Sequence, residues 1–336
     1  MGQEDLLASR FALSPLGELG NLLHHLGNSA GQPNRLPPPV RARWSGRFAE
    51  MRDEPGIRAI LALLSRAYSA DFVAPPPAGM AQTIADDLAV VRATPAALAR
   101  EEIGRALHQS RRPDRDVRAF LAGRDVVGRL ADALETAWTQ LIGPDWPQLR
   151  AIIERDVVHR AGQLTRAGWA GALTGMHDDA AWRNGGLEIR RPEAGRAVLG
   201  GRGLLFVPSV FVYPGLAVYL DPHWRPALVY PARGSAALWE QQPAAMPGSL
   251  QRLLGASRAR LLLTLDEPAS TTQLAATAGL SLGAVGGHLR ILLDAGLLSR
   301  ARAGRSVLYR RTPAGDALIA AQPQPQPQPQ PKPQPD

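Results

Sequence analysis

The sequence predicts an α+β protein, mostly α, with a helical N-terminal domain that carries a small antiparallel sheet and a smaller C-terminal module of helices and a hairpin. Three observations predict it. Apolar residues recur at helical spacing through most of the first 180 residues. Short β-prone runs, separated by Gly, Pro and Asp, follow up to Tyr230. Helix caps and a glycine-centred hairpin then occupy residues 248–321, and a length of 336 residues suits two domains.

Capped apolar stripes mark the first helices. Ser14-Pro15 precedes leucines spaced at helical intervals up to Leu26, with serine as the cap and proline in the first turn. Thr94-Pro95 opens another helix that continues through Leu107. Further helices are expected at 57–64, 125–142 and 147–164.

Near residue 185 the sequence pattern changes from helical periodicity to short β-prone runs. The small antiparallel sheet is predicted from the β-prone runs 187–190, 197–199, 204–207, 216–220 and 227–230. A helix is expected at 235–241 and a linker at 243–248. We therefore expect a regulatory or dimerisation domain over 1–243, a second domain over 248–321 and a disordered Gln-Pro tail over 322–336, because proline at every second position prevents regular structure.

Composition and charge exclude several classes of protein. Cysteine is absent, which removes disulfides, thiolate metal sites and cysteine nucleophiles. Thirty-seven arginines and one lysine against 30 acidic residues give a net charge of +8, which favours a polyanionic partner. Residues 203–220 lack charge, but Pro208 and Pro214 divide them into strand-like runs. We expect no membrane span and no signal peptide, and hence a cytoplasmic protein.

The C-terminal module has the most specific pattern. Ser270-Thr271-Thr272-Gln273 matches a capping box, Gly279 ends that helix, and Ser281 caps the next one. Two helices joined by a short glycine turn make a helix-turn-helix. The second helix is expected to bury a stripe of Leu282, Val285, Leu289, Leu292 and Leu293. A hairpin over 297–311 and a helix opened by Thr312-Pro313 complete a winged helix-turn-helix.

Residues 284–298 (AVGGHLRILLDAGLL) and 304–309 (GRSVLY) closely resemble the ArsR family of bacterial transcriptional regulators. The preceding region resembles an uncharacterised domain found fused to such winged helices, as at Ser14–Leu19 and Trp169–Gly171. The resemblance implies a homodimer that binds double-stranded DNA. Metal-sensing members of the family use cysteines or a His/Asp set in the terminal helix, which this chain lacks apart from Asp316.

Charge supports DNA as the partner. Residues 248–321 hold nine arginines and four acids, a net charge of +5, and residues 296–311 hold five arginines and no acid. Gly286-Gly287 replaces the polar or basic residues of the relatives, so base reading depends on fewer side chains. The expected DNA-contacting residues are Thr271, Thr272, Ser281, Gly283, Ala284, Gly287, His288, Arg290, Arg300, Arg302, Arg305 and Arg310.

No motif for metal, cofactor or catalysis stands out. The seven histidines form no paired ligand arrangement, and phosphate-loop and nucleophile-elbow patterns are absent, so no cofactor, metal or enzyme activity is predicted. We expect a repressor whose first domain binds a hydrophobic small-molecule effector. A cavity for it is expected among Trp169, Phe206, Phe211, Tyr213, Tyr219 and Trp224. Two alternatives stay open, an enzyme in residues 1–247 and a protein-interaction adaptor.

Overall fold

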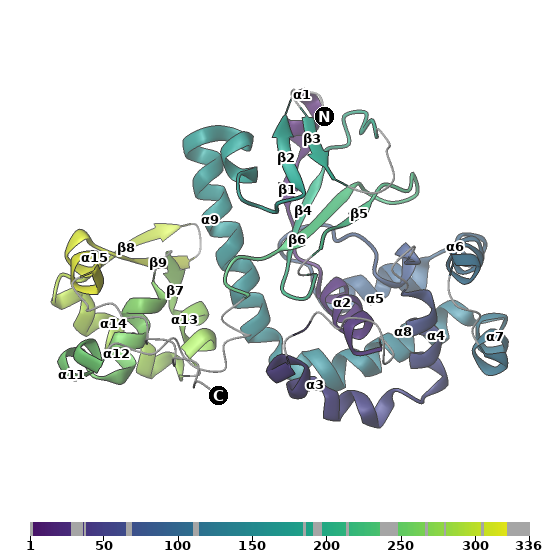
Figure 1. Ribbon diagram of the computed structural model, residues 1–336, viewed down its shortest axis with the longest axis horizontal. Coiled ribbons are helices and arrows are strands. Elements are labelled where there is room, and N and C mark those ends of the chain that lie inside the picture. The colour runs from purple at the N-terminus through teal and green to yellow at the C-terminus, as the bar shows by residue number, and fades with distance from the viewer. Residues whose placement is uncertain are drawn as a thin grey trace, which may run out of the picture. The chain divides into compact units, whose positions relative to one another are not determined.

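The computed structural model describes residues 3–27, 36, 38–64, 69–109, 114–183, 186–190, 197–212, 215–235, 248–265, 268–278, 280–303 and 306–320. The chain divides into two compact units, residues 1–241 and residues 242–336, whose helices and strands appear in Figure 1. Each unit has its own hydrophobic core. The Gln-Pro tail, residues 243–247 of the predicted linker and residues 236–241 of the predicted helix lie outside the described residues.

Helices build most of the first unit. They are α1 Gln3–Ala8, α2 Pro15–Gly27, α3 Pro38–Met51, α4 Pro55–Leu63, α5 Ile84–Ala93, α6 Ala96–Gln109, α7 Arg115–Leu121, α8 Val126–Ala137 and α9 Trp146–Leu173. A 3-10 turn lies at Asp71–Val73, and a π turn, Trp138–Ile142, and a 3-10 turn, Gly143–Asp145, join α8 to α9. The predicted start of α2 is confirmed, because the Gly17 N–H donates to the Ser14 hydroxyl at 3.0 Å.

A four-stranded mixed sheet packs beside these helices. Its strands, in spatial order, are β1 Arg10–Phe11, β4 Leu205–Ser209, β6 Ala227–Pro231 and β5 Ala217–Tyr219. Strands β1 and β6 run parallel to β4, and β5 is antiparallel to β6. A separate antiparallel hairpin pairs β2 Ala180–Arg183 with β3 Gly186–Ile189. The strands predicted near 187–190, 204–207, 216–220 and 227–230 are thus confirmed.

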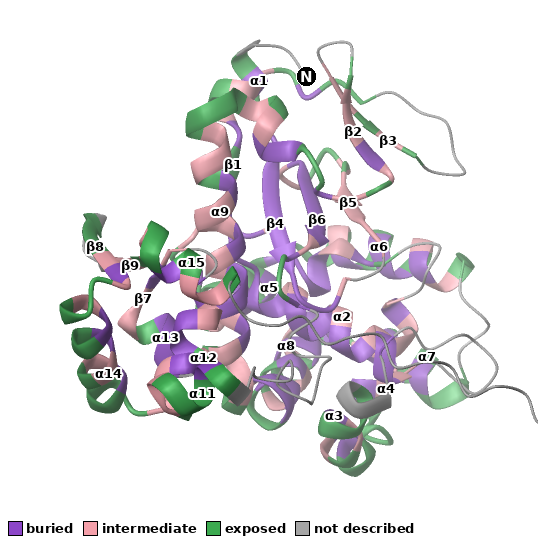
Figure 2. Cartoon of the chain, turned by 60° about the vertical axis from the view of Figure 1, so that its left-hand side comes forward, coloured by how far each residue is buried: buried purple, intermediate pink, exposed green. Residues whose placement is uncertain are grey.

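The fold class, α+β and mostly α, is confirmed, but the prediction of an antiparallel sheet is wrong for two pairings, because β1 and β6 run parallel to β4. Strands β4 and β6 are buried along nearly their whole length (Figure 2). Parallel strands are typically buried on both faces and have continuous apolar sequences, and the unbroken apolar run Leu204–Val207 fits this pattern. The run 197–199 is also corrected: it forms no strand and leads into a turn with Gly200 and Gly201 at positive φ.

Helix α9 extends beyond the predicted 147–164 and is kinked. The backbone leaves helical geometry at Ala167 and Gly168, where Gly168 has φ 64°, a conformation that favours glycine. After the kink, Trp169 stacks on Phe206 of β4, with ring centroids 5.2 Å apart. The kink therefore turns an aromatic side chain onto the sheet beside which α9 packs (Figure 1).

A buried ion pair joins α9 to the sheet. Asp156 and Arg160 lie one turn apart on α9, both almost fully buried, with Nε and Oδ2 3.1 Å apart. The same carboxylate accepts from the Tyr230 hydroxyl at 2.6 Å and from the Arg233 backbone N–H at 3.0 Å. Arg160 also donates to the Ala172 carbonyl at 2.8 Å. Both charges are paired and further hydrogen-bonded, which is the condition for burying them.

Two buried carboxyls fix α2. The Glu18 carboxyl accepts from the Val210 backbone N–H at 3.1 Å, just after β4. Burial raises the pKa of Glu18 to about 7, against hydrogen bonds from Ser209, Val210 and Phe211 that lower it. Asp87 of α5 accepts from the Leu16 N–H in the first turn of α2 at 2.9 Å, and burial raises its pKa to about 7 as well.

The second unit is smaller. Its helices are α11 Gly248–Leu254, α12 Ala256–Thr264, α13 Thr271–Ala278, α14 Leu282–Asp294 and α15 Pro313–Ala320. Strands β7 Ala269–Ser270, β8 Leu298–Ala303 and β9 Ser306–Arg311 form an antiparallel sheet in the order β7-β9-β8. The predicted helix-turn-helix followed by a hairpin is confirmed, and β7 is a strand that the sequence did not reveal.

The predicted apolar stripe of α14 needs one correction. Val285, Leu289 and Leu292 are buried and Leu293 is half-buried, but Leu282 is 55% exposed. A helical side chain leans toward the N-terminus and covers the preceding turn. Leu282 is the first residue of α14, so it has no preceding turn to cover.

Residues 203–220 form β4 and β5 in the described part, but Pro208 lies inside β4, paired with Tyr230, and does not divide two strands as predicted. Among the helices that the structure describes, none combines the length and apolar character needed to cross a membrane.

Candidate nucleic-acid interface

Two side-chain caps fix the starts of α13 and α14. The Ser270 N–H donates to Gln273 Oε1 at 2.8 Å, and the Gln273 N–H donates to Ser270 Oγ at 3.3 Å. The predicted capping box is therefore confirmed. Ser281 Oγ accepts from the Ala284 N–H at 3.3 Å, as predicted for the cap of α14. Gly279, the predicted turn residue, lies outside the described residues.

The outer face of α14 has few long side chains. Ser281, Gly283, Ala284, Gly287 and Arg290 are exposed, as predicted, whereas His288 is half-buried. A Cβ built on Gly283, Gly286 or Gly287 would meet no atom within 4 Å. From residue 283 to residue 287, no exposed side chain of α14 is larger than a methyl group. Thr272 is exposed and Thr271 half-buried at the start of α13.

The β8–β9 hairpin, the wing, carries arginines on both faces. Arg300 pairs with Tyr309 and Arg302 with Val307, so these arginines share one face of the hairpin. Both are exposed. Arg310 pairs with Ser299 on the opposite face, and its Nε donates to the Ser299 hydroxyl at 3.1 Å. Arg305, at the predicted tip, lies outside the described residues.

Arg311, which the sequence groups with the basic hairpin, has a different role. Its Nε lies 2.6 Å from Asp316 of α15, and its Nη1 donates to the Leu262 carbonyl at 3.2 Å. Arg311 therefore joins the hairpin to α12 and α15. The exposed arginines of the described wing are Arg300, Arg302 and Arg310.

The aromatic residues predicted to line one cavity do not lie together, and that expectation is corrected. Trp169 and Phe206 belong to one cluster, whereas Phe211 packs edge-on against Trp44, with centroids 5.2 Å apart. Tyr219 packs in a third cluster. Tyr213 lies outside the described residues. Phe206 and Phe211 are fully buried and Trp169, Tyr219 and Trp224 half-buried, and the five side chains are divided among three apolar clusters.

Two of these aromatics are held by hydrogen bonds near a group of acids. The Tyr219 hydroxyl donates to the Ala74 carbonyl at 2.8 Å, and Trp224 Nε1 donates to Glu102 at 2.7 Å. Burial and the neighbouring Glu102 carboxylate raise the pKa of Asp71 to about 7. Among the described residues, no group of three or more His, Asp and Glu side chains could hold a metal ion.

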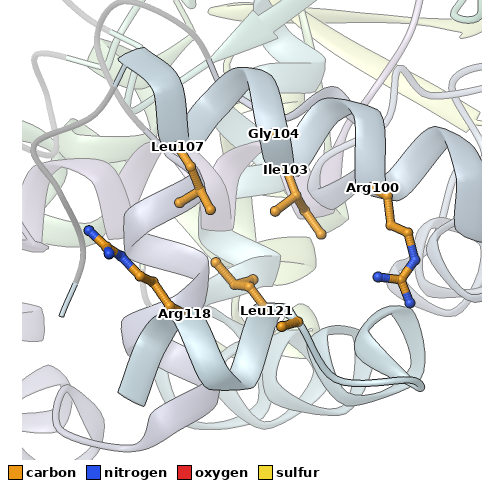
Figure 3. A pocket seen from close by; sticks show the side chains of 7 residues that line it. Arg100, Ile103, Gly104, Leu107, Arg118 and Leu121 are labelled. Atoms are coloured by element: carbon orange, nitrogen blue, oxygen red, sulfur yellow. The ribbon is translucent and has the colours of Figure 1, made fainter. Parts of the chain in front are cut away.

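The structure reveals a surface groove that the sequence did not predict. It lies between α6 and α7, has a volume of about 240 Å³, and is walled by Ile103, Leu107 and Leu121. Figure 3 shows the guanidinium groups of Arg100 and Arg118 toward its opposite ends. Among the described residues, neither arginine has an ion-pair partner. The residues that line the groove come from α6 and from the region of α7, so no single stretch of sequence predicts it.

Comparisons with known proteins agree with this division of the chain. Residues 253–300 match the helix-turn-helix domain, and residues 93–236 match a family of unknown function. The HTH-type transcriptional regulator NmtR of Mycobacterium tuberculosis is 40% identical over 78 residues, which cover 23% of this chain and 65% of that protein. No solved structure gives a significant match. The resemblance to the ArsR family, with an uncharacterised N-terminal domain, is confirmed.

Proposed function

We propose that the chain is a DNA-binding transcriptional regulator, acting as a repressor, whose second unit binds double-stranded DNA. One observation carries the proposal: a helix-turn-helix with an open outer face on α14 is followed in the chain by a hairpin with exposed arginines on both faces. The similarity to a named transcriptional regulator over this segment supports it.

The two parts have complementary roles in this proposal. The N-terminal turns of α14 enter the major groove, where Ser281 and His288 can bond to base edges. Arg300, Arg302 and Arg310, together with Arg305 between the two strands, neutralise phosphates. Thr271, Thr272 and Arg290 contact the backbone on either side of the groove. Gly283, Ala284 and Gly287 let the helix approach closely.

The chain acts as a homodimer in this proposal. Two copies related by a twofold axis read two half-sites about one helical turn, ~34 Å, apart. Repression then follows from occupying promoter DNA that a polymerase would otherwise bind.

Substitutions at Gly287 test DNA binding without unfolding the helix. The site is open, and glycine is a weak helix former, so a longer side chain is accepted there. Gly287→Glu adds a carboxylate to the proposed DNA-facing surface, where a like charge costs several kcal/mol. We expect affinity for a fluorescein-labelled random duplex pool to fall roughly 100-fold.

Gly287→Gln is the control for side-chain size and should retain most of the affinity. Equal binding by the wild type, Gly287→Glu and Gly287→Gln would contradict the proposed interface. If the wild type does not bind duplex DNA at 50 mM salt, the adaptor alternative is favoured.

Ligand control is a second part of the proposal, and the groove between α6 and α7 supports it. Apolar walls between two arginines without ion-pair partners suit a small amphipathic anion, with an apolar body and an acidic group. Such a ligand regulates DNA binding only if it favours one arrangement of the two units over another.

The apolar anion 8-anilinonaphthalene-1-sulfonate serves as the probe for this groove. We expect its fluorescence to rise with the intact chain, and its affinity to fall in the double variant Arg100→Ala/Arg118→Ala. Arg115→Ala removes an exposed arginine of α7 that does not line the groove, and it should leave the affinity unchanged. Equal affinities in all three proteins would remove the groove from the proposal.

A further inference from the structure

Leu282 is the exposed residue of α14 that the apolar pattern assigned to the core. It is 55% exposed, on the first residue of the helix, directly after the Ser281 cap. An exposed leucine alone says little, because apolar atoms contribute much of any protein surface. What surrounds this leucine is informative.

The neighbours of Leu282 offer bases almost no hydrogen-bonding groups. Residues 283, 284, 286 and 287 are Gly, Ala, Gly and Gly, and the side chain of Val285 points into the core. The Ser281 hydroxyl accepts from the Ala284 N–H and keeps its own O–H as a donor. His288 is half-buried at the end of the second turn. The surface from 281 to 287 is therefore mainly apolar carbon.

This surface belongs to a positively charged unit. Residues 248–321 carry a net charge of +5, and the wing arginines are exposed. Phosphate contacts from a wing fix the orientation of a protein on DNA but carry no sequence information. Sequence reading then falls to the helix, whose surface between residues 282 and 287 supplies mainly apolar contact. In the major groove, the 5-methyl group of thymine is the base-edge group that apolar side chains contact.

We infer that Leu282 recognises thymine 5-methyl groups in the major groove, so that thymine methyls are part of the preferred DNA sequence beside any bases that Ser281 and His288 bond. This inference rests on the proposed DNA binding. Gly283 and Gly287 have a part in it, because the absence of side chains lets α14 approach the bases until the leucine touches a methyl group.

Deoxyuridine provides the test, since it differs from thymidine only in lacking this methyl group. The intact chain is first used to select binding sequences from a random duplex pool amplified with dTTP. Each thymine of a selected sequence is then replaced by deoxyuridine. Burying one methyl group contributes about 0.8 kcal/mol, so affinity should fall about fourfold at one or two positions in each half-site.

Protein variants identify the side chain that reads the methyl group. The Leu282→Ala variant should bind the thymine and uracil duplexes with the same affinity. The Leu282→Met variant should keep part of the preference for thymine over uracil. Leu253→Ala is the matched control, since Leu253 of α11 is 66% exposed in the same unit, and it should preserve the full preference. Circular dichroism checks that the variants fold, and exposed sites seldom change stability by more than ~0.5 kcal/mol.

The outcomes separate this inference from the proposed function. If no sequence is enriched from the pool, DNA binding itself fails. If the selected DNA binds tightly but uracil has no effect at any position, the inference fails and DNA binding stands. Leu282→Ala could instead lower the affinity for both duplexes by the same factor and leave the preference for thymine intact, or change only the oligomeric state. Leu282 would then contact sugar, phosphate or a second copy of the chain, and the inference would be overturned.

Discussion

The first unit places charged side chains in its interior, whereas the second keeps them at its surface. Glu18, Asp87, Asp156 and Arg160 are buried and hydrogen-bonded in the first unit. In the second unit, Gln273 is the buried polar side chain among the described residues, and it completes a helix cap. Buried charges of the first unit therefore hold helices to the sheet, whereas in the second unit Arg300, Arg302 and Arg310 are exposed on the wing.

Removing a buried charge of the first unit should have the largest effect. Asp156→Ala leaves the Arg160 guanidinium buried without its carboxylate and removes the acceptor for Tyr230. Breaking one side of a buried pair typically costs ~3–5 kcal/mol. We expect a loss of that size in the free energy of unfolding, measured by urea denaturation.

The matched control for Asp156→Ala is Asp132→Ala. Asp132 pairs with Arg92 at 3.0 Å on the surface, and such pairs contribute at most about 1 kcal/mol. Similar losses in the two variants would show that burial does not distinguish the two kinds of ion pair.

The Glu18 carboxyl should make the first unit less stable as the pH rises. Its pKa is 4.5 for the free side chain and about 7 in the folded chain, because burial disfavours the charge. The stability that this group contributes is fully present below its unfolded pKa and is lost as the pH rises through the folded pKa. We expect the free energy of unfolding to fall by roughly 2 kcal/mol between pH 5 and pH 8.

Glu18→Gln should weaken this pH dependence, and Asp87, whose pKa is also raised, supplies part of the remainder. Urea titrations at several pH values measure both proteins. A pH dependence unchanged by Glu18→Gln would contradict the assignment to this carboxyl.

At the surface of the second unit, His288 should matter for sequence preference and little for stability. A side chain that bonds to a base edge contributes ~1–3 kcal/mol of discrimination. His288→Ala should therefore relax the preference at one or two base pairs, measured by competition between selected duplexes. Full discrimination in the variant would instead make His288 a packing residue, in keeping with its half-buried position.

The smallest expected effect is a gain in stability. Gly286 is inside α14 with open space where a Cβ would stand, so Gly286→Ala should stabilise the second unit by ~0.5–1 kcal/mol. Gly315→Ala is the contrasting variant, because its Cβ would collide with the Leu297 carbonyl oxygen. The midpoint temperature of thermal unfolding should rise for Gly286→Ala and fall for Gly315→Ala.

The same contrast explains how much of each unit the sequence could predict. The caps at Ser270 and Ser281 are local, with the bonded residues three positions apart, so their patterns are visible in the sequence. One parallel partner of β4 is β1, which lies near the start of the sequence and has only two residues. Likewise, Asp156 and Tyr230 are 74 residues apart. No local sequence pattern predicts a strand pairing or a hydrogen bond between residues so far apart.

In the candidate site too, the features that depend on local sequence were predicted and those that depend on the rest of the fold were not. The outward positions of α14 follow from helical periodicity, and the structure agrees at Ser281, Gly283, Ala284 and Gly287. Leu282 departs from the pattern because periodicity ignores where a helix begins. The aromatic cavity failed because composition identifies apolar residues but not which of several cores they enter.

The salt dependence of DNA binding tests most directly whether the α14 and wing surface binds DNA. Affinity of the intact chain for a selected duplex is measured by fluorescence anisotropy over a range of salt concentrations. Each phosphate contact contributes about 0.9 to the log–log slope, so Arg300→Ala/Arg302→Ala should reduce the slope by about 1.8 and weaken all sequences alike. Arg260→Ala, an exposed arginine of α12, should leave the slope unchanged. An unchanged slope in the double variant would contradict the account.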